Sequence, residues 1–140
     1  MSQLKLLALD SEDLEVISTC CQDAILKIGN MDFLTAEKRF VLMLNRFVWE
    51  NKNSKERHKS VLHFDRVNNV KLQGIDRRDK EMVISLLAIL FRSDDGPGGT
   101  IELVFAGDGA IRLEVECIEA QLADLQAAWE ARSRPKHEQG

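Results

Sequence analysis

The chain has 140 residues, 44% of them hydrophobic and 30% charged, with a net charge of -4 at pH 7. This composition is typical of one globular domain, which we expect at residues 1–131, with a flexible tail at 132–140. No apolar run approaches the roughly 20 residues that cross a membrane, and residues 1–20 hold four acidic residues, so we expect neither a membrane anchor nor a signal peptide.

The three cysteines, Cys20, Cys21 and Cys117, are an odd number and lack the C-x-x-C spacing of many metal sites. They are typical of small buried side chains in a reducing compartment. We therefore expect a cytoplasmic protein.

The charge changes sign twice along the chain. Residues 1–35 sum to -4 (2 basic, 6 acidic), residues 36–99 to +4 (13 basic, 9 acidic) and residues 100–140 to -4 (4 basic, 8 acidic). One interpretation is that these segments are neighbours in a sheet and neutralise one another across its solvent face. The other is a basic surface for an anionic partner, to which the polar segment 52–59 could belong.

The first elements are a short apolar strand at residues 4–9 and a helix that Asp10 or Ser11 can cap and that ends near residue 21. The apolar positions of this helix have the spacing of one buried face: Leu14, Ile17 and Cys21.

A turn signal follows at Gly29-Asn30, between the apolar segments 24–28 and 31–34. This pattern predicts a two-residue β-hairpin. Its register pairs charge with charge and apolar with apolar: Lys27 with Asp32 and Leu26 with Phe33.

Two later segments, residues 38–49 and 82–91, are apolar on both faces of the predicted strand. In the second, alternation places Met82, Ile84, Leu86 and Leu90 on one face and Val83, Leu87, Ile89 and Phe91 on the other. Residues 60–67 and 70–73 form one bent strand or two, broken at Asn68-Asn69. Four apolar strand faces need covering. Either the N-terminal helix covers the second face and the protein is a monomer, or a two-fold homodimer forms through a sheet face or edge near residues 82–91 or 38–49, and we favour the dimer.

A second hairpin and a helix complete the predicted fold. Residues 101–105 and 111–117 alternate apolar and polar side chains on either side of Gly107-Asp108-Gly109. From residue 118 the apolar period becomes helical, with one stripe made of Ile118, Leu122, Leu125 and Trp129. We expect this helix to pack on the sheet as a lid, with Trp129 buried.

Together these elements predict an α+β fold: an antiparallel β-barrel or sandwich of about seven strands, capped by the C-terminal helix and preceded by a short strand and helix. The order of elements resembles pleckstrin-homology-like barrels. That resemblance implies lipid-phosphate binding by basic residues after the first strand. The loop at that place here is Gly29-Asn30 with Asp32 beyond it, which argues against this activity.

The whole chain also resembles an uncharacterised bacterial family, a domain of unknown function best known from alphaproteobacteria. The resemblance covers nearly all of residues 4–135, through the segments LALDSEDLEVIS, LLNRFVWE, VLHFDRV, SLLAILF and VFAGDGAIRLEVECIEAQLADLQAAW. It implies a stand-alone cytosolic protein and supplies no catalytic residue.

Three polar residues in otherwise apolar strands are the candidates for ligand binding: His63, Asp65 and Arg112. His63 and Asp65 share a strand face, as an acid-base pair or half of a metal site would, and as an ordinary surface polar pair also would. Arg112 could bind an anion or form an ion pair within the chain. No second cluster of metal-ligating residues accompanies them and no known catalytic motif is present, so we expect no metal, no cofactor and no catalytic residue.

These observations favour a non-enzymatic binding or assembly module with a protein partner. The alternative is a small-ligand-binding protein or enzyme that uses His63, Asp65 and Arg112. Nucleic acid is disfavoured as a partner, because the isoelectric point is about 5.4 and the basic loop has no aromatic residue for base stacking.

Overall fold

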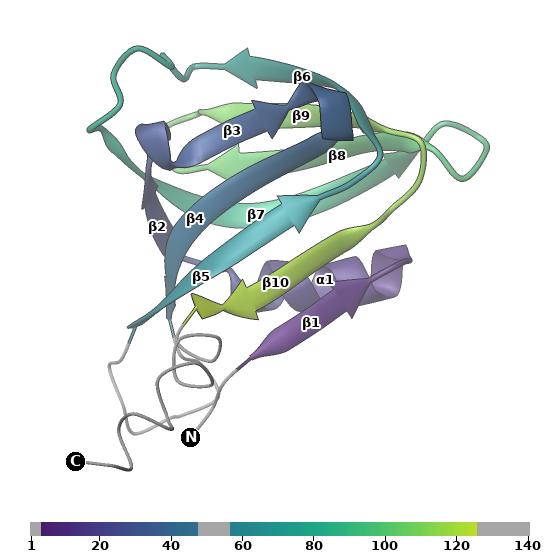
Figure 1. Cartoon of the computed structure of the whole chain (residues 1–140), viewed down its shortest axis with the longest axis horizontal. Coiled ribbons are helices and arrows are strands. Elements are labelled where there is room, and N and C mark those ends of the chain that lie inside the picture. The colour runs from purple at the N-terminus through teal and green to yellow at the C-terminus, as the bar shows by residue number, and fades with distance from the viewer. Residues whose placement is uncertain (1–3, 48–56, 126–140) are drawn as a thin grey trace.

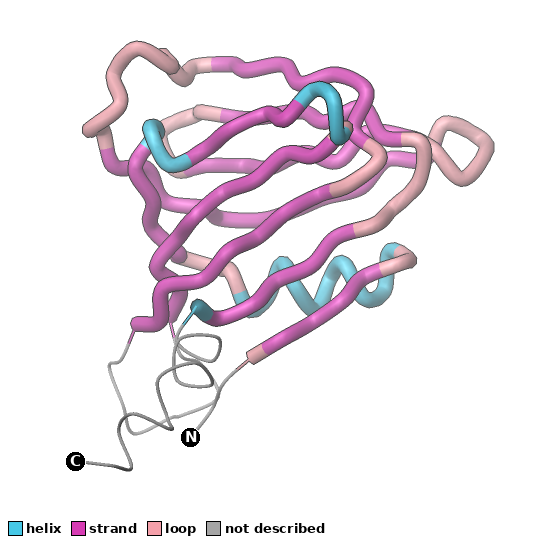
Figure 2. Tube along the Cα trace, viewed as in Figure 1, coloured by secondary structure: helices cyan, strands magenta, loops and turns pink. Residues whose placement is uncertain are grey.

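The computed structural model describes residues 4–47 and 57–125, which form ten β-strands and one α-helix (Figure 1). The strands and the helix, in chain order, are β1 (Lys5–Ala8), α1 (Ser11–Cys20), β2 (Ala24–Lys27), β3 (Met31–Leu34), β4 (Arg39–Phe47), β5 (Arg57–Phe64), β6 (Val67–Gln73), β7 (Val83–Ser93), β8 (Gly99–Phe105), β9 (Ala110–Val115) and β10 (Ala120–Asp124). Strands therefore dominate the described part of the chain (Figure 2).

All strands belong to one antiparallel sheet in the order β1-β10-β5-β4-β2-β7-β8-β9-β6, with β3 paired to β4 beside this path. The strands alternate one buried and one more exposed side chain, as half-buried antiparallel strands do. The buried side chains of both halves of the sheet form one hydrophobic cluster. The sheet is therefore curved around a single core (Figure 1). We call the face of the sheet that points to this core its inner side and the opposite face its outer side.

The N-terminal strand and helix agree with the sequence prediction. Asp10 caps α1 by accepting a hydrogen bond from the Asp13 backbone N–H at 2.8 Å, and the predicted apolar face is buried. The helix lies against β1 and β7, where the Ser18 hydroxyl accepts a hydrogen bond from the Ile89 backbone N–H at 2.9 Å. In this position α1 covers the edge of β7 beyond the end of β2.

The predicted C-terminal cap is wrong, because residues 120–124 form β10 and not a helix. The inward side chains of β10 follow period two: Ala120, Leu122 and Asp124. Leu122 satisfies both periods, so the apolar residues alone could not separate strand from helix. Residues 120–124 form a strand because β1 and β5 would otherwise have unpaired edges, and β10 supplies hydrogen-bond partners for the backbone groups of both.

The fold is therefore neither a seven-stranded barrel with a C-terminal helical lid nor a pleckstrin-homology-like domain. Residues 4–47 and 57–125 form one ten-stranded antiparallel sheet, and the one α-helix among them lies near the N-terminus. Trp129 and its expected burial lie outside the described residues.

The predicted hairpin at residues 24–34 is also wrong, because β2 and β3 do not pair with each other. Both run along β4, and the residues between them form a 3₁₀ turn, Ile28–Asn30, that does not reverse the chain. Lys27 forms its ion pair with Glu81 at 2.9 Å and does not face Asp32. The backbone of β2 pairs instead with β7, a long-range interaction that the local turn signal does not reveal.

A bulge in β7 changes which residues face the core. Its register with β8 shifts between Leu86 and Ala88, so Ile84 and Leu86 are buried before the shift and Ile89 is buried after it. Strict alternation is therefore wrong beyond Leu86. The bulge leaves Leu87 and Leu90 exposed.

The connection between β5 and β6 falls at Asp65 and Arg66, where Arg66 has a φ of 62°, rather than at Asn68-Asn69. The Asn-Asn pair coincides instead with a register shift between Val67 and Asn69. The β8-β9 hairpin is confirmed, with both apolar rows facing the core and Gly107 at a φ of 82° in its turn.

We expect Leu122→Ala to destabilise the chain by about 2–5 kcal/mol, since it removes a fully buried side chain of β10. The neighbouring Gln121→Ala, on the outer side of the same strand, is the matched control and should change the unfolding free energy little. Denaturant unfolding of both variants measures this. Equal effects of the two substitutions would contradict the alternation of β10.

Candidate functional site

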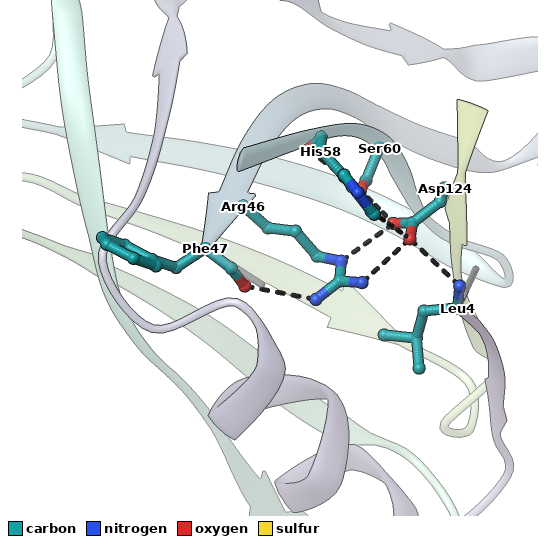
Figure 3. A network of polar contacts seen from close by, with 6 residues as sticks. All are labelled: Leu4, Arg46, Phe47, His58, Ser60 and Asp124. Carbon is teal, nitrogen blue, oxygen red and sulfur yellow. Dashed lines mark hydrogen bonds and ion pairs between the residues drawn. The ribbon is translucent and has the colours of Figure 1, made fainter. Parts of the chain in front are cut away.

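A buried ion pair between Arg46 and Asp124 lies at one end of the core (Figure 3). Arg46 Nε donates to Asp124 Oδ1 and Arg46 Nη2 donates to Asp124 Oδ2, both at 2.8 Å. Arg46 is 0% exposed and Asp124 is 2% exposed. The two parallel hydrogen bonds make this the bidentate arrangement in which arginine binds a carboxylate most strongly.

Three further groups surround the same carboxylate. The Ser60 hydroxyl donates to Oδ1 at 2.6 Å, the Leu4 backbone N–H donates to Oδ2 at 3.0 Å, and His58 Nδ1 lies 3.1 Å from Oδ2. Burial raises the pKa of the Asp124 carboxyl, but the hydrogen bonds from Arg46, Ser60, Leu4 and His58 outweigh it and hold the pKa well below its usual range. Asp124 is therefore a fixed anion that links β10 to β4, to β5 and to the start of β1.

Strand alternation explains why these polar side chains are buried. Arg46 follows Phe40, Leu42 and Leu44 in the inward row of β4, and Ser60 precedes Leu62 and Phe64 in that of β5. The register then pairs Asp124 with Ser60. Sequence reasoning missed this cluster because residue 124 was assigned to a helix. A charged residue at an inward position of β4 was the available signal.

Ser60, His58 and Asp124 are the residue types of a hydrolytic triad, but the hydrogen bonds that connect them differ from those of a triad. In a triad the serine donates to the histidine, whereas Ser60 donates to Asp124. The carboxylate is also neutralised by Arg46, and Ser60 is fully buried. Nearby, burial raises the pKa of the Cys21 thiol to about 12, which disfavours its reactive thiolate. The arrangement of these side chains therefore stabilises the fold and does not form a catalytic site.

His63 and Asp65, both predicted as site residues, lie together on the outer side near the end of β5. His63 Nδ1 is 3.4 Å from Asp65 Oδ2 but is buried and makes no hydrogen bond, while Arg39 Nε donates to Asp65 Oδ1 at 2.6 Å. Burial lowers the pKa of His63, and Arg39 lowers it further, against the opposing charges of Asp65 and Glu119.

Next to this pair lies a hollow of about 250 Å³ that is lined by both basic and acidic side chains. It is lined by Glu37, Lys38, Arg39, Asp65, Arg66 and Glu119. Arg66 contacts Glu119 at 3.3 Å and Lys38 contacts Glu116 at 2.7 Å. Arg39, Arg66 and Lys38 therefore already have partners within the chain.

Arg112, the third predicted site residue, has different partners. Its guanidinium donates to the Gln73 side-chain oxygen at 2.9 Å and lies 3.3 Å from Glu102. These contacts come from β6 and β8, and none of them joins Arg112 to His63 or Asp65. The structure thus brings two of the three predicted residues together.

Cross-strand ion pairs confirm that the basic middle and acidic C-terminal segments neutralise each other. Basic residues from 36–99 pair with glutamates from 100–140 as follows: Lys38 with Glu116, Arg66 with Glu119, Lys71 with Glu114, and Arg92 with Glu102. Four cations of residues 57–92 lack an ion-pair partner among the residues that the structure describes: Arg57, Lys59, Arg77 and Lys80. Of these, Arg57 donates hydrogen bonds to the backbone oxygens of Asp23 and Asn45.

Lys59, Arg77 and Lys80 line two adjoining hollows on the outer side of the sheet, which we call the β2-β4 groove. The first, of about 440 Å³, is lined by Ile25, Leu26, Lys27, Asn30, Met43, Leu44, Asn45, Lys59, Glu81 and Val83. The second, of about 420 Å³, is lined by Ile28, Gly29, Asn30, Met31, Asp32, Val41, Met43, Arg77 and Lys80. Asn30 and Met43 belong to both.

The 3₁₀ turn between β2 and β3 accounts for the position of the groove. On the β4 side, Asn45 pairs with Ile25 and Leu42 pairs with Met31, so two residues of β4 lie opposite five residues of the β2–β3 segment. The extra residues bend away from β4 and interrupt the pairing there.

Residues 4–47 and 57–125 contain no group of three or more His, Cys, Asp or Glu side chains placed to hold a metal ion. Within the same residues, no helix has both the length and the apolar character needed to cross a membrane. The expected absence of a metal and a cofactor stays a prediction.

Comparison with protein families gives one assignment. The family described as "Protein of unknown function (DUF2948)" matches residues 4–137, nearly the whole chain. The chain belongs to this family. The predicted resemblance to a family of unknown function is thereby confirmed, whereas a bacterial origin stays a prediction. Comparison of this DUF2948 chain with curated proteins and with solved structures gives no significant match.

We expect Asp124→Ala to destabilise the DUF2948 chain by about 3–5 kcal/mol, because it leaves the Arg46 guanidinium buried without its carboxylate. Glu81→Ala is the matched control, since it breaks the exposed ion pair with Lys27 and should change stability little. Denaturant unfolding at neutral pH compares them.

The pH dependence distinguishes the charge of Asp124 from its packing. A carboxyl whose pKa is lowered by folding stabilises the chain fully above its unfolded pKa of about 3.9, and this stabilisation is lost as the pH falls below that value. Asp124→Asn should therefore lose less stability than the wild type on acidification. If the unfolding free energies of the wild type and Asp124→Asn fell in parallel below pH 4, this result would contradict a stabilising ion pair at Asp124.

We expect His63 to titrate below its ordinary pKa of about 6.5, and Asp65→Asn to lower that pKa further. The substitution removes the anion that favours the imidazolium and leaves Arg39 without its partner, and both changes disfavour protonation. Titration of the imidazole by NMR measures the shift. A rise of the His63 pKa in the variant would show that burial and Arg39 do not control it.

Proposed function

We propose that this protein is a non-enzymatic binding or assembly module that contacts a protein partner through the β2-β4 groove. The observation that carries the proposal is an apolar area on the outer side of the sheet. Met43 and Val83 line the groove and are 38% and 54% exposed. Met82 and Leu87, from the β7 region, are exposed without lining either hollow, and Leu90 lines a separate hollow beside α1.

Exposed apolar side chains gathered beside a hollow are typical of interaction sites. Single exposed apolar residues are common on soluble proteins, and Leu7, Leu9 and Val16 are examples elsewhere on this chain. The groove differs from these because its apolar residues adjoin two hollows and cations without ion-pair partners. A second copy of the chain is one candidate for the partner, as the sequence prediction of a homodimer requires.

The location that we propose for this module is the cytoplasm. Cys20, Cys21 and Cys117 form no disulfide bond in the structure, as expected in a reducing compartment. A protein partner is favoured over nucleic acid, because neither hollow of the groove is lined by an aromatic side chain on which a base could stack.

The alternative function, small-ligand binding or catalysis by His63, Asp65 and Arg112, has less support. Asp65 already accepts a short hydrogen bond from Arg39, and Arg112 contacts a different set of residues. The buried Nδ1 of His63 is the one feature that favours it, because a ligand could supply the missing hydrogen bond.

We expect Val83→Glu to abolish capture of the partner, because it places a charge in the apolar part of the groove. The matched control is Val16→Glu on α1, the same substitution at a residue of similar exposure, 50% against 54%. Wild-type and variant chains serve as bait in a lysate, and bound proteins are compared by quantitative mass spectrometry. Proteins held by the wild type and Val16→Glu but lost by Val83→Glu would support the proposal.

Equal binding by all three baits would contradict it. Sedimentation equilibrium of the wild type tests the homodimer separately. A mass near 15.9 kDa at every concentration would exclude a second copy as the partner.

A further inference from the structure

We infer that the β2-β4 groove binds an extended, acidic segment of a partner polypeptide. The inference rests on the proposed function and adds the chemistry of the ligand. It comes from the charges that the fold leaves without partners, together with the shape and apolar floor of the groove.

The charges at the groove are unequal. Lys59 lines the first hollow, and Arg77 and Lys80 line the second; none of the three has an ion-pair partner among the described residues. The acidic residues that line the hollows are Glu81, which pairs with Lys27, and Asp32. After this pairing, three cations face one anion. Such an excess attracts an anionic partner and disfavours a basic one.

Three of the cations without an ion pair among the described residues, Lys59, Arg77 and Lys80, line the groove, whereas Lys5 lies on β1 and Arg57 donates to backbone oxygens. Most lysines and arginines of residues 36–99 that the structure describes are held by carboxylates on neighbouring strands, as Lys38, Arg66 and Lys71 are. Three of the exceptions, Lys59, Arg77 and Lys80, adjoin the place where the 3₁₀ turn separates the β2–β3 segment from β4. The second charge interpretation, a basic surface, is therefore proposed for this groove.

Gly29 supports this arrangement by bringing a basic loop to the groove. Its backbone N–H donates to the Lys80 carbonyl oxygen at 2.9 Å, and a Cβ at this position would lie 2.9 Å from the Lys80 Cβ. A side chain here would displace the backbone at Lys80. The contact therefore fixes the position from which Lys80 reaches the second hollow.

The layout of the groove fits an extended chain better than a single small anion. The cations are divided between two hollows, so one phosphate or carboxylate would not meet all three. Met43 lies between them as an apolar contact, and the amides of Asn30 and Asn45 can hydrogen-bond a peptide backbone. An extended segment with acidic residues on both sides of an apolar one matches these three features.

The probe for this inference is a display library of random short peptides, selected against the full-length chain. We expect enriched peptides to carry an excess of Asp and Glu beside an apolar residue, and their binding to weaken with salt. Lys80→Glu and Lys59→Glu should each lower the affinity of the strongest peptide by about tenfold or more, because each replaces attraction by like-charge repulsion.

Lys5→Glu is the matched control. Lys5 is an exposed cation of β1 that also lacks an ion pair among the described residues, and its substitution changes the net charge equally. We expect it to alter the affinity by no more than about twofold, through the weak long-range field alone. A loss equal to that of Lys80→Glu would overturn the inference, because binding would then depend on net charge and not on the groove.

Three other results would also overturn it: enrichment of neutral or basic peptides, tighter Lys80-dependent binding of a labelled single-stranded oligonucleotide, or a wild-type dimer that Val83→Glu dissociates. The last result would make a second copy the occupant. Failure of the proposed function is a different result, in which lysate capture does not depend on Val83. The library experiment and the capture experiment can therefore fail independently.

Discussion

The bidentate pair between Arg46 and Asp124 is the interaction on which the arrangement of β10 depends. Placing two charges in a core is costly, and the cost is offset here because each carboxylate oxygen has several hydrogen-bond donors. Those donors come from β4, from β5 and from the residue before β1, so a shift of β10 by one residue would leave all of them unsatisfied. The charge cluster thus selects one register for four strands of the sheet.

The inner and outer sides of the sheet follow from this register. Once β10 lies between β1 and β5, its apolar side chains complete the core that α1 and the other strands enclose. The outer side is then covered largely by charges, and ion pairs such as Lys71 with Glu114 and Arg66 with Glu119 neutralise most of them. The β2-β4 groove is where this cover is incomplete, because the 3₁₀ turn interrupts strand pairing and no carboxylate of the described residues pairs with Lys59 or Lys80.

The two polar clusters of the molecule therefore have different functional meanings. The Asp124 cluster is saturated by its own donors and buried, so it stabilises the fold and has no access to a substrate. The groove, in contrast, is exposed, and it is lined by apolar residues and by three cations that have no ion-pair partner among the described residues. This contrast is why we assign the binding role to the groove and not to the residue types that resemble a catalytic set.

The sequence alone determined the local features: the capped helix α1, the β8-β9 hairpin, the apolar strand β4 and the membership of a family of unknown function. The three structural features depend on periodicity or on contacts between near neighbours, which a single chain displays directly, and the family membership depends on similarity along residues 4–137. Tertiary structure decided the rest. Residues 120–124 became a strand because β1 and β5 offered backbone partners, Gly29-Asn30 became a 3₁₀ turn because β7 paired with β2, and a bulge exchanged the faces of β7 after Leu86. Long-range pairing also brought Arg39 to Asp65, beside His63, and placed Arg112 next to Gln73 and Glu102 instead, since local periodicity carries no information on which strands become neighbours.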